Sequence, residues 1–279
     1  MKRYLVETNG PEAKDELKKT FEYVGEPKAL QNFVVIETEQ KTPMQVLDSM
    51  EHVVSFENDA ETQKFGTKSW ALDYVSGNDS GYTPKRTGRN VDIFVMDTGI
   101  RPDHVDFNGR VETVYSYDGR DYDEDNGHGT GSASCAAGEV LGVAKEANIL
   151  NVRYNLSRSD GLKALDTILD RHLNKDTNNP SVLNMSFGSN SRILKNALKQ
   201  LYKNGVVLVA AAGNDDAPGR QYPASNPFVI SVMANNRRDK PSEFTNYSDG
   251  NDIFAPGTQV PMADPSNPRS MVAASGTSF

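Results

Sequence analysis

The run Val91-Asp92-Ile93-Phe94-Val95-Met96, followed by Asp97-Thr98-Gly99, decides the fold of this chain. Its apolar residues follow one another with little polar alternation, which is typical of a strand buried on both faces of a parallel sheet. Similar apolar runs recur further along the chain, at Ile149–Val152, Val182–Met185, Val206–Ala211 and Phe228–Val232. The chain from residue 91 onward is therefore expected to form five or more buried parallel strands.

Helical patterns lie between these strands. Apolar residues recur at helical spacing in Leu162–Leu173, where Leu162, Leu165, Ile168 and Leu169 share one face, and again in Arg192–Lys203. Strands that alternate with helices predict an α/β fold with a doubly wound, mainly parallel sheet over residues 91–279. In such sheets ligands bind at the carboxyl ends of the strands, so the residues that follow each strand are the candidates for chemistry.

The first sixty residues follow a different pattern. Strands are predicted at Tyr4–Val6, Phe33–Ile36 and Val53–Phe56, and helices at Pro11–Tyr23 and from Thr42-Pro43 onward. Threonine as N-cap and proline at the first helical position favour that second helix start. Residues 1–60 are therefore expected to form a small α+β, ferredoxin-like domain. Residues 61–90, polar and glycine-punctuated around Trp70, are interpreted as a linker and the lead-in to the domain over 91–279.

Composition excludes several classes of function. The net charge of −8 over 279 residues argues against a nucleic-acid partner, which would select a basic surface. The longest apolar run, Val206–Ala212, is too short to cross a bilayer, so no membrane partner is expected. Met1–Glu7 contains no apolar signal region. The single cysteine, Cys135, excludes an internal disulfide and is expected to be a buried, inert thiol.

Four polar residues stand beside glycine in the predicted strand ends and turns: Asp97, His128, Asn214 and Ser278. Taken singly, each also fits a structural turn. Together and in this order they supply the parts of acyl transfer. Ser278 would attack a carbonyl group, His128 would transfer the proton, and Asp97 would orient the imidazole. Asn214 would donate a hydrogen bond to the developing oxyanion. The order excludes an α/β-hydrolase, whose serine precedes its acid and histidine.

Seven ordered motifs over residues 91–279 resemble those of the subtilases, the subtilisin-like serine proteases, and specifically the proteinase K group. They are Val95–Ile100, with His104–Arg110 beside it, Asn126–Thr130, Asn184–Gly188, Ala211–Asn214, Phe244–Ser248, Asp252–Gly257 and Gly276–Ser278. The resemblance implies a subtilisin-like fold, polypeptide substrates, no required cofactor, a capacity for structural calcium and an extracellular location.

The resemblance also implies roles for neighbouring segments. Ser186, Phe187 and Gly188 would form one edge of the substrate cleft, to which a peptide adds as a strand. Ala211, Ala212 and Gly213 would line the primary specificity pocket, although simple sheet packing is the alternative for both stretches. Residues 1–60 resemble the family's propeptide, an intramolecular inhibitor released by cleavage within Glu57–Lys64.

Two departures from the family pattern affect the expected activity. Gly131 stands where the family usually has a second histidine, which should alter packing more than chemistry. The sequence stops one residue after Ser278, without the helix that would hold the nucleophile, so we expect a C-terminally truncated peptidase domain with little activity.

Other functions remain open from the sequence. A non-catalytic, subtilase-like peptide-binding protein and an esterase or lipase with the same triad are the alternatives to a zymogen of a serine endopeptidase. The acidic stretch Asp121–Gly127 fails the EF-hand pattern and is interpreted as a solvated loop, so no metal ligand is assigned.

Overall fold

The computed structural model describes residues 2–9, 11–25, 33–38, 46–47, 49–50, 52–58, 69–77, 82–188, 191–248 and 253–279. The chain divides into two units, Met1–Gly66 and Thr67–Phe279. The start of the helix predicted from Thr42 lies outside the described residues, as does most of the predicted processing segment, from Asp59 onward.

The first unit is an antiparallel sheet with a helix. It contains β1 (Lys2–Thr8), α1 (Pro11–Thr20), β2 (Glu22–Gly25), β3 (Phe33–Thr38) and β4 (Val53–Asn58), and its strand order is β2-β3-β1-β4. Leu17 of α1 packs with Val6, Val34 and Ile36 of the sheet in a small core. The helix predicted to reach Tyr23 ends at Thr20 instead, because Glu22, Tyr23 and Gly25 pair with β3 as a strand, and the aromatic Tyr23 and β-branched Val24 favour that conformation.

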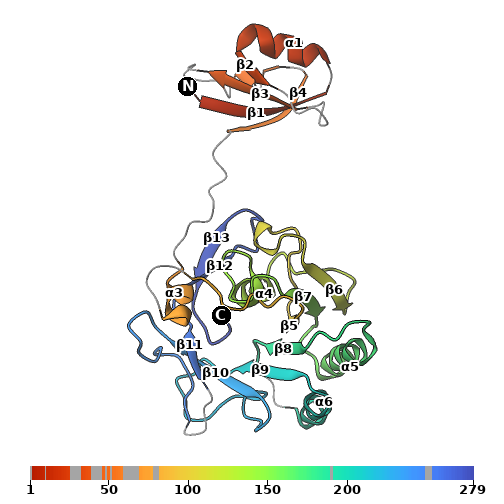
Figure 1. The fold of residues 1–279 in the computed structure, drawn as a ribbon, viewed down its shortest axis with the longest axis vertical. Helices are drawn as coiled ribbons and strands as arrows, with labels where there is room; N and C mark the ends of the chain where they lie inside the picture. Colours follow the sequence, from red (N-terminus) through yellow and green to blue (C-terminus); the bar gives the residue numbers. More distant parts are fainter. Residues whose placement is uncertain are drawn as a thin grey trace. The chain divides into compact units, whose positions relative to one another are not determined.

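The second unit is built on one seven-stranded sheet (Figure 1). Its strands are β5 (Asp92–Asp97), β6 (Val111–Ser116), β7 (Asn148–Arg153), β8 (Ser181–Met185), β9 (Val207–Ala211), β10 (Ile230–Asn235) and β11 (Ile253–Pro256). They are parallel in the order β11-β10-β9-β8-β5-β7-β6. The strand order reverses around β5, which is where such sheets bind ligands.

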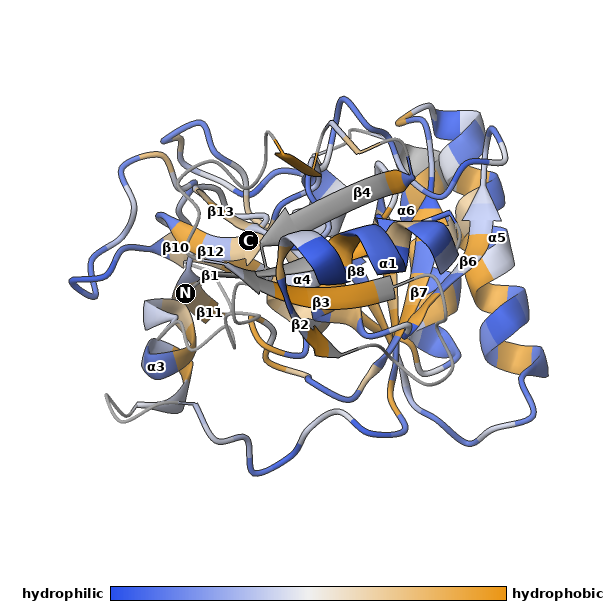
Figure 2. Cartoon of the chain, turned by 90° about the horizontal axis from the view of Figure 1, so that it is seen from above, coloured by the Kyte–Doolittle hydropathy of each residue, from blue (hydrophilic) through white to orange (hydrophobic). Residues whose placement is uncertain are grey.

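Helices cover both faces of this sheet. Phe94 and Met96 of β5 point into the core that contains α5 (Arg158–Asn174) and α6 (Arg192–Lys203). Ile93 and Val95 point into the opposite core, with Ala133 and Ala137 of α4 (His128–Ala137). Figure 2 shows hydrophobic and hydrophilic segments alternating along α5 and α6, as expected for helices with one buried face. The predicted α/β, doubly wound, mainly parallel sheet is confirmed.

Several elements differ from their predicted form. α5 begins at Arg158, with Ser157 as its N-cap, and Leu162 is 42% exposed although it was expected on the buried face. The strand expected at Phe228–Val232 runs later, as β10, because Val232 pairs with both Ala211 and Ile253.

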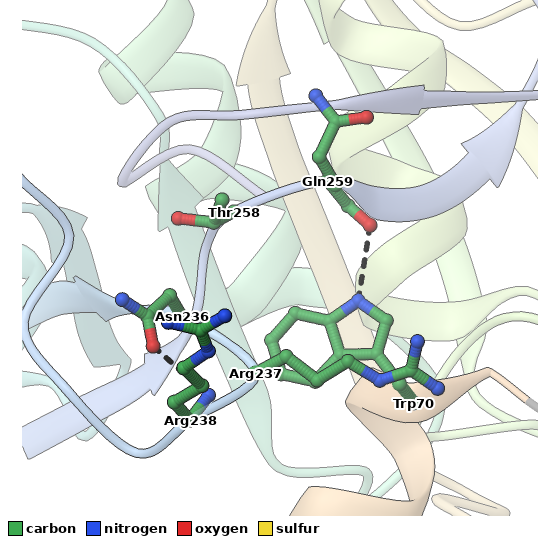
Figure 3. Close-up of a pocket in the computed structure, with 6 residues that line it drawn as sticks. All are labelled: Trp70, Asn236, Arg237, Arg238, Thr258 and Gln259. Carbon is green, nitrogen blue, oxygen red and sulfur yellow. Dashed lines mark hydrogen bonds between the residues drawn. The ribbon is translucent and has the colours of Figure 1, made fainter.

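Several short elements were not predicted from the sequence. They include α3 (Trp70–Ser76), the half-buried edge strand β6, the short helix η1 (Val105–Phe107) and the hairpin of β12 (Val260–Ala263) and β13 (Met271–Ala274). The Trp70 indole nitrogen donates to the Gln259 carbonyl oxygen at 3.0 Å, which anchors α3 next to β12 (Figure 3). Among the described residues, no helix has both the length and the apolar character needed to traverse a lipid bilayer.

Candidate active site

Asp97 and His128 form a hydrogen-bonded pair at the carboxyl edge of the sheet. Asp97 is the last residue of β5 and His128 is the first residue of α4. The imidazole Nδ1 lies 2.9 Å from Asp97 Oδ1 and 3.0 Å from Oδ2. The Asp97 side chain is 3% exposed and that of His128 is 32% exposed. The pair therefore presents a histidine to solvent with a buried carboxylate behind it.

Thr98 holds both members of this pair. Its backbone N–H donates to Asp97 Oδ1 at 2.7 Å. Its hydroxyl donates to the Asn126 carbonyl oxygen at 3.0 Å and accepts from the Gly129 N–H at 3.1 Å. Gly129 follows His128 in the first turn of α4, so Thr98 joins the strand that carries the acid to the helix that carries the base.

The environment of His128 favours its protonated form. Burial disfavours the charge on the ring, but the hydrogen bond and the negative charge of Asp97 outweigh burial and raise the pKa of His128 above its ordinary value. With Nδ1 engaged by the carboxylate, Nε2 is the nitrogen left to exchange a proton with a neighbouring group. The arrangement is suited to general acid–base catalysis.

Ser278 lies near α4 and the end of β8, but its hydroxyl is not bonded to His128. Ser278 Oγ donates to the Ser186 carbonyl oxygen at 3.2 Å. The Ser278 carbonyl oxygen accepts from Ser186 Oγ at 3.1 Å and from Ser132 Oγ at 3.3 Å. In the part of the chain that the structure describes, no hydrogen bond joins Ser278 to His128. The Phe279 ring lies 5.2 Å from the imidazole, centroid to centroid.

Asn214 is bound to the residue that precedes Ser278. Its Oδ1 accepts from the Thr277 N–H and from the Thr277 hydroxyl, both at 2.9 Å. Asn214 is exposed, and its Nδ2 has no hydrogen-bond partner among the described residues. The side-chain amide is thus oriented by its oxygen and keeps its N–H groups available to a ligand.

The segments expected to bind substrate follow adjacent strands. Ser186, Phe187 and Gly188 come directly after β8, while Ala211 ends β9 and is followed by Ala212 and Gly213. Ser186 is buried and Phe187 half-buried, with the Phe187 ring 5.0 Å from that of Tyr154. Gly188 is exposed. The Ser186 hydroxyl already donates to the Ser278 carbonyl oxygen. A ligand at this edge would therefore contact backbone groups and Gly188.

Gln221 lies between these two segments and was not predicted. Its backbone N–H donates to the Ala212 carbonyl oxygen at 2.9 Å, and its side chain occupies the space where a Cβ on Gly188 would stand. Gly213 has a φ of +117°, and a Cβ there would collide with the Asn246 side chain. Glycine is therefore required at position 213 by its backbone conformation and close packing, whereas at position 188 a larger residue would displace the Gln221 side chain.

Three further residues missed from the sequence stand inside or close to the motifs: Thr98, Ser132 and Thr277. Thr98, Ser132 and Thr277 each make a hydrogen bond to the site, yet their role depends on contacts between distant segments. Small hydroxyl residues next to the candidate aspartate, histidine and serine were the available signal. Among the described residues, no three or more His, Cys, Asp or Glu side chains group closely enough to hold a metal ion.

A separate cavity of about 410 Å³ lies away from these residues (Figure 3). It is lined by Trp70, Asn236, Arg237, Arg238, Thr258 and Gln259. None of the sequence-predicted site residues borders it, so it contributes nothing to the arrangement around His128.

Comparisons with known proteins agree with this architecture. The profile described as "Subtilase family" matches residues 88–279. Proteinase R of Parengyodontium album is 33% identical over 202 residues, which cover 68% of this chain and 52% of that protein. The subtilisin-like serine protease Pen ch 18 of Penicillium rubens is 38% identical over 186 residues, which cover 62% of this chain and 38% of that protein.

A solved structure shares both the sequence pattern and the fold. The crystal structure of a cold-adapted subtilisin-like serine proteinase matches with a TM-score of 0.68 and 32% identity, covering 76% of this chain and 80% of that one. This chain spans about half the length of Proteinase R, with 52% of that protein covered.

Proposed function

This chain belongs to the subtilase family, and from that premise we propose that it acts as a serine endopeptidase through Asp97, His128 and Ser278. The observation that carries the proposal is the hydrogen bond of 2.9 Å between His128 Nδ1 and the buried Asp97 carboxylate. A buried acid behind a half-exposed imidazole is the arrangement that makes histidine an oriented base.

In the proposed reaction, Ser278 Oγ attacks the carbonyl carbon of the scissile peptide bond. His128 Nε2 takes the hydroxyl proton and later gives it to the leaving amine, while Asp97 stabilises the charged imidazole. The oxyanion of the tetrahedral intermediate accepts hydrogen bonds from Asn214 Nδ2 and the Ser278 N–H. Water then hydrolyses the acyl-enzyme. Attack requires Ser278 Oγ to leave the Ser186 carbonyl oxygen and bond to His128 Nε2.

The substrate is proposed to be a polypeptide. Its backbone would pair with residues 186–188, and the side chain before the scissile bond would enter the pocket bordered by Ala211, Ala212 and Gly213. No cofactor or metal takes part in these steps. The unit Met1–Gly66 is proposed to be an inhibitory propeptide, and the chain to be the zymogen form.

The position of the Ser278 hydroxyl favours one competing function, a peptide-binding protein without turnover. A fluorophosphonate probe, which phosphonylates activated serines with loss of fluoride, separates the two. In the full-length protein that carries this chain, Ser278 should be labelled, and Ser278→Ala should lose labelling and at least about 10³-fold in peptide hydrolysis. An unlabelled wild type that still binds peptides would favour the non-catalytic function.

A further inference from the structure

A buried guanidinium lies behind the candidate acid, and nothing in the proposed reaction uses it. Arg153 is the last residue of β7 and is paired in register with Asp97, the last residue of β5. Its side chain is 1% exposed. An arginine is almost never this buried unless its charge is compensated and its N–H groups are bonded.

Asp118 compensates the charge of Arg153. Arg153 Nε lies 3.0 Å from Asp118 Oδ1, and a terminal guanidinium nitrogen lies 3.0 Å from Asp118 Oδ2. This two-pronged geometry is the strongest pairing that arginine makes with a carboxylate. The hydrogen bond from Arg153 holds the pKa of Asp118 well below its usual range, so the pair is ionised at neutral pH. The Tyr117 ring covers the guanidinium at 4.9 Å.

The remaining terminal nitrogen of Arg153 donates to the Thr98 carbonyl oxygen. Thr98 is the residue whose N–H holds the Asp97 carboxylate and whose hydroxyl holds the first turn of α4. The guanidinium therefore holds the peptide unit between Thr98 and Gly99, which directly follows the unit whose N–H bonds the Asp97 carboxylate. Through Thr98 it constrains the direction in which the Asp97 carboxylate faces His128.

The turn after Asp97 is built to receive this contact. Gly99 has a φ of +108°, and a Cβ there would collide with the Asp121 carbonyl oxygen and crowd the Arg153 side chain. The Ile100 N–H donates to that same Asp121 carbonyl oxygen at 3.1 Å. The turn is thus pressed between the loop at Asp121 and the guanidinium, and only glycine fits at its centre.

We propose that Arg153, held by Asp118, is a positioning residue for the Asp97–His128 pair and acts through the Thr98 carbonyl. The inference deepens the proposed function and rests on it for the catalytic readout. It also stands on its own for the geometry of the pair, which can be measured without turnover.

The test uses the full-length protein that carries this chain and four variants. Arg153→Met removes the hydrogen-bond donors and keeps an unbranched side chain. Arg153→Lys keeps the positive charge but cannot bond to two groups as the planar guanidinium does. Asp118→Asn removes the carboxylate that holds the guanidinium. Arg110→Met is the matched control. Arg110 is half-buried, whereas Arg153 is buried, but it likewise donates to backbone carbonyls: those of Ala137 and Ala147, each at 2.8 Å, and that of Asp106 at 3.5 Å. Variants are compared at equal folded fraction by circular dichroism.

Two quantities are measured. For hydrolysis of a peptide amide substrate, Arg153→Met should lower kcat about tenfold or more with KM within about twofold, because the lost interaction concerns the pair and not the bound peptide. Arg153→Lys should recover part of that loss, and Arg110→Met should keep the wild-type kcat. In proton NMR, the downfield Nδ1 proton of His128 should shift or broaden in Arg153→Met and stay in place in Arg110→Met.

Equal losses of kcat in Arg153→Met and Arg110→Met, with the His128 proton unmoved, would show a purely structural arginine and overturn the inference. If Arg153→Met does not fold, the same two measurements are made on Asp118→Asn. An unchanged His128 proton resonance together with an unchanged kcat in that variant would overturn the inference. A wild type without peptidase activity whose His128 proton still responds to Arg153→Met contradicts the proposed function and supports the positioning role.

Discussion

At the scale of single residues, the site depends on which atoms are already engaged. Asp97 is bonded by Thr98 and His128, so its carboxylate has one orientation. Asn214 is bonded through its oxygen, so its N–H groups face outward unpaired among the described residues. Ser278 is bonded to Ser186. Each of these side chains thus has defined hydrogen-bond partners before a ligand binds. The effect of replacing one of them can therefore be predicted.

The pKa of His128 gives the first prediction. Because Asp97 raises it above 6.5, kcat/KM should fall as the pH is lowered through a midpoint above 6.5, where the base becomes protonated. Asp97→Asn removes the charge and leaves burial, so the pKa should drop below 6.5 and kcat should fall about 10⁴-fold at neutral pH. A proton NMR titration of His128 measures the pKa directly. An identical pKa in wild type and Asp97→Asn would contradict the assignment.

The same shift links pH to stability. The folded pKa of His128 lies above its unfolded value, so protonated His128 stabilises the fold fully below about pH 6.5. That contribution is lost as the pH rises through the folded pKa. Urea unfolding at pH 6 and pH 9 should show a larger decrease in the free energy of unfolding for wild type than for Asp97→Asn.

Cys135 gives a further prediction at this scale. The residue, expected to be buried, is half-buried against Trp70, Ala71 and Val260. Burial of the sulfur still raises the pKa of the thiol to about 12, so almost no thiolate exists at pH 8. Alkylation by iodoacetamide at pH 8 should be roughly 100-fold slower than that of a free cysteine peptide, and urea should remove the difference. Rapid labelling of the native protein would show that the thiol is not in an apolar environment.

At the scale of elements, α5 shows how burial and sequence pattern can disagree. Leu162 and Leu165 belong to the same apolar stripe, yet Leu162 is 42% exposed and Leu165 is 2% exposed. The buried residues of α5 are Asp160, Gly161, Ala164, Leu165 and Ile168, and Leu165 and Ile168 pack in the core that contains Phe94 and Met96. Leu162 therefore lies beside the buried face, so a periodic apolar stripe locates that face only approximately.

This difference predicts unequal costs for the same substitution. Leu165→Ala should lower the free energy of unfolding by about 2–5 kcal/mol, because it leaves a cavity beside the sheet. Leu162→Ala, the matched control in the same helix, should change it by less than about 0.5 kcal/mol. Chemical denaturation of both variants measures the two changes in the free energy of unfolding. Equal changes would contradict the burial of Leu165 and the exposure of Leu162.

At the scale of the whole molecule, the chain consists of two units with separate cores. The small core of the first unit and the two-sided core of the second share no residue. A small antiparallel unit ahead of a subtilase unit is what a zymogen requires, and this organisation motivates a prediction about processing.

In the full-length protein that carries this chain, we predict a cut between about Glu57 and Trp70 that the protein makes in itself. His128→Ala should abolish the cut, since it removes the base, and Arg89→Ala, at an exposed ion pair remote from the site, should not. Mass spectrometry of the purified proteins locates the cut. An uncut wild type with full peptidase activity would overturn the zymogen proposal.

Much of the fold and of the candidate site could be predicted from the sequence alone. Runs with few polar residues, such as Val91–Met96, predicted a parallel sheet, because strands covered on both faces favour such a composition. The order of Asp97, His128 and Ser278 determined which residues to expect at its carboxyl edge. Both inferences use information that is local along the chain, namely periodicity and the residues next to each strand end.

Only the tertiary structure decided how those residues are held. Arg153 and Thr98 are 55 positions apart and meet because β5 and β7 are paired in register, which no local pattern encodes. The Ser278 hydroxyl bonds to the carbonyl oxygen of Ser186, 92 positions away in the chain. Strand register and side-chain partners are determined by packing among segments that are distant in sequence. For that reason the sequence identified the candidate site but not its supporting contacts.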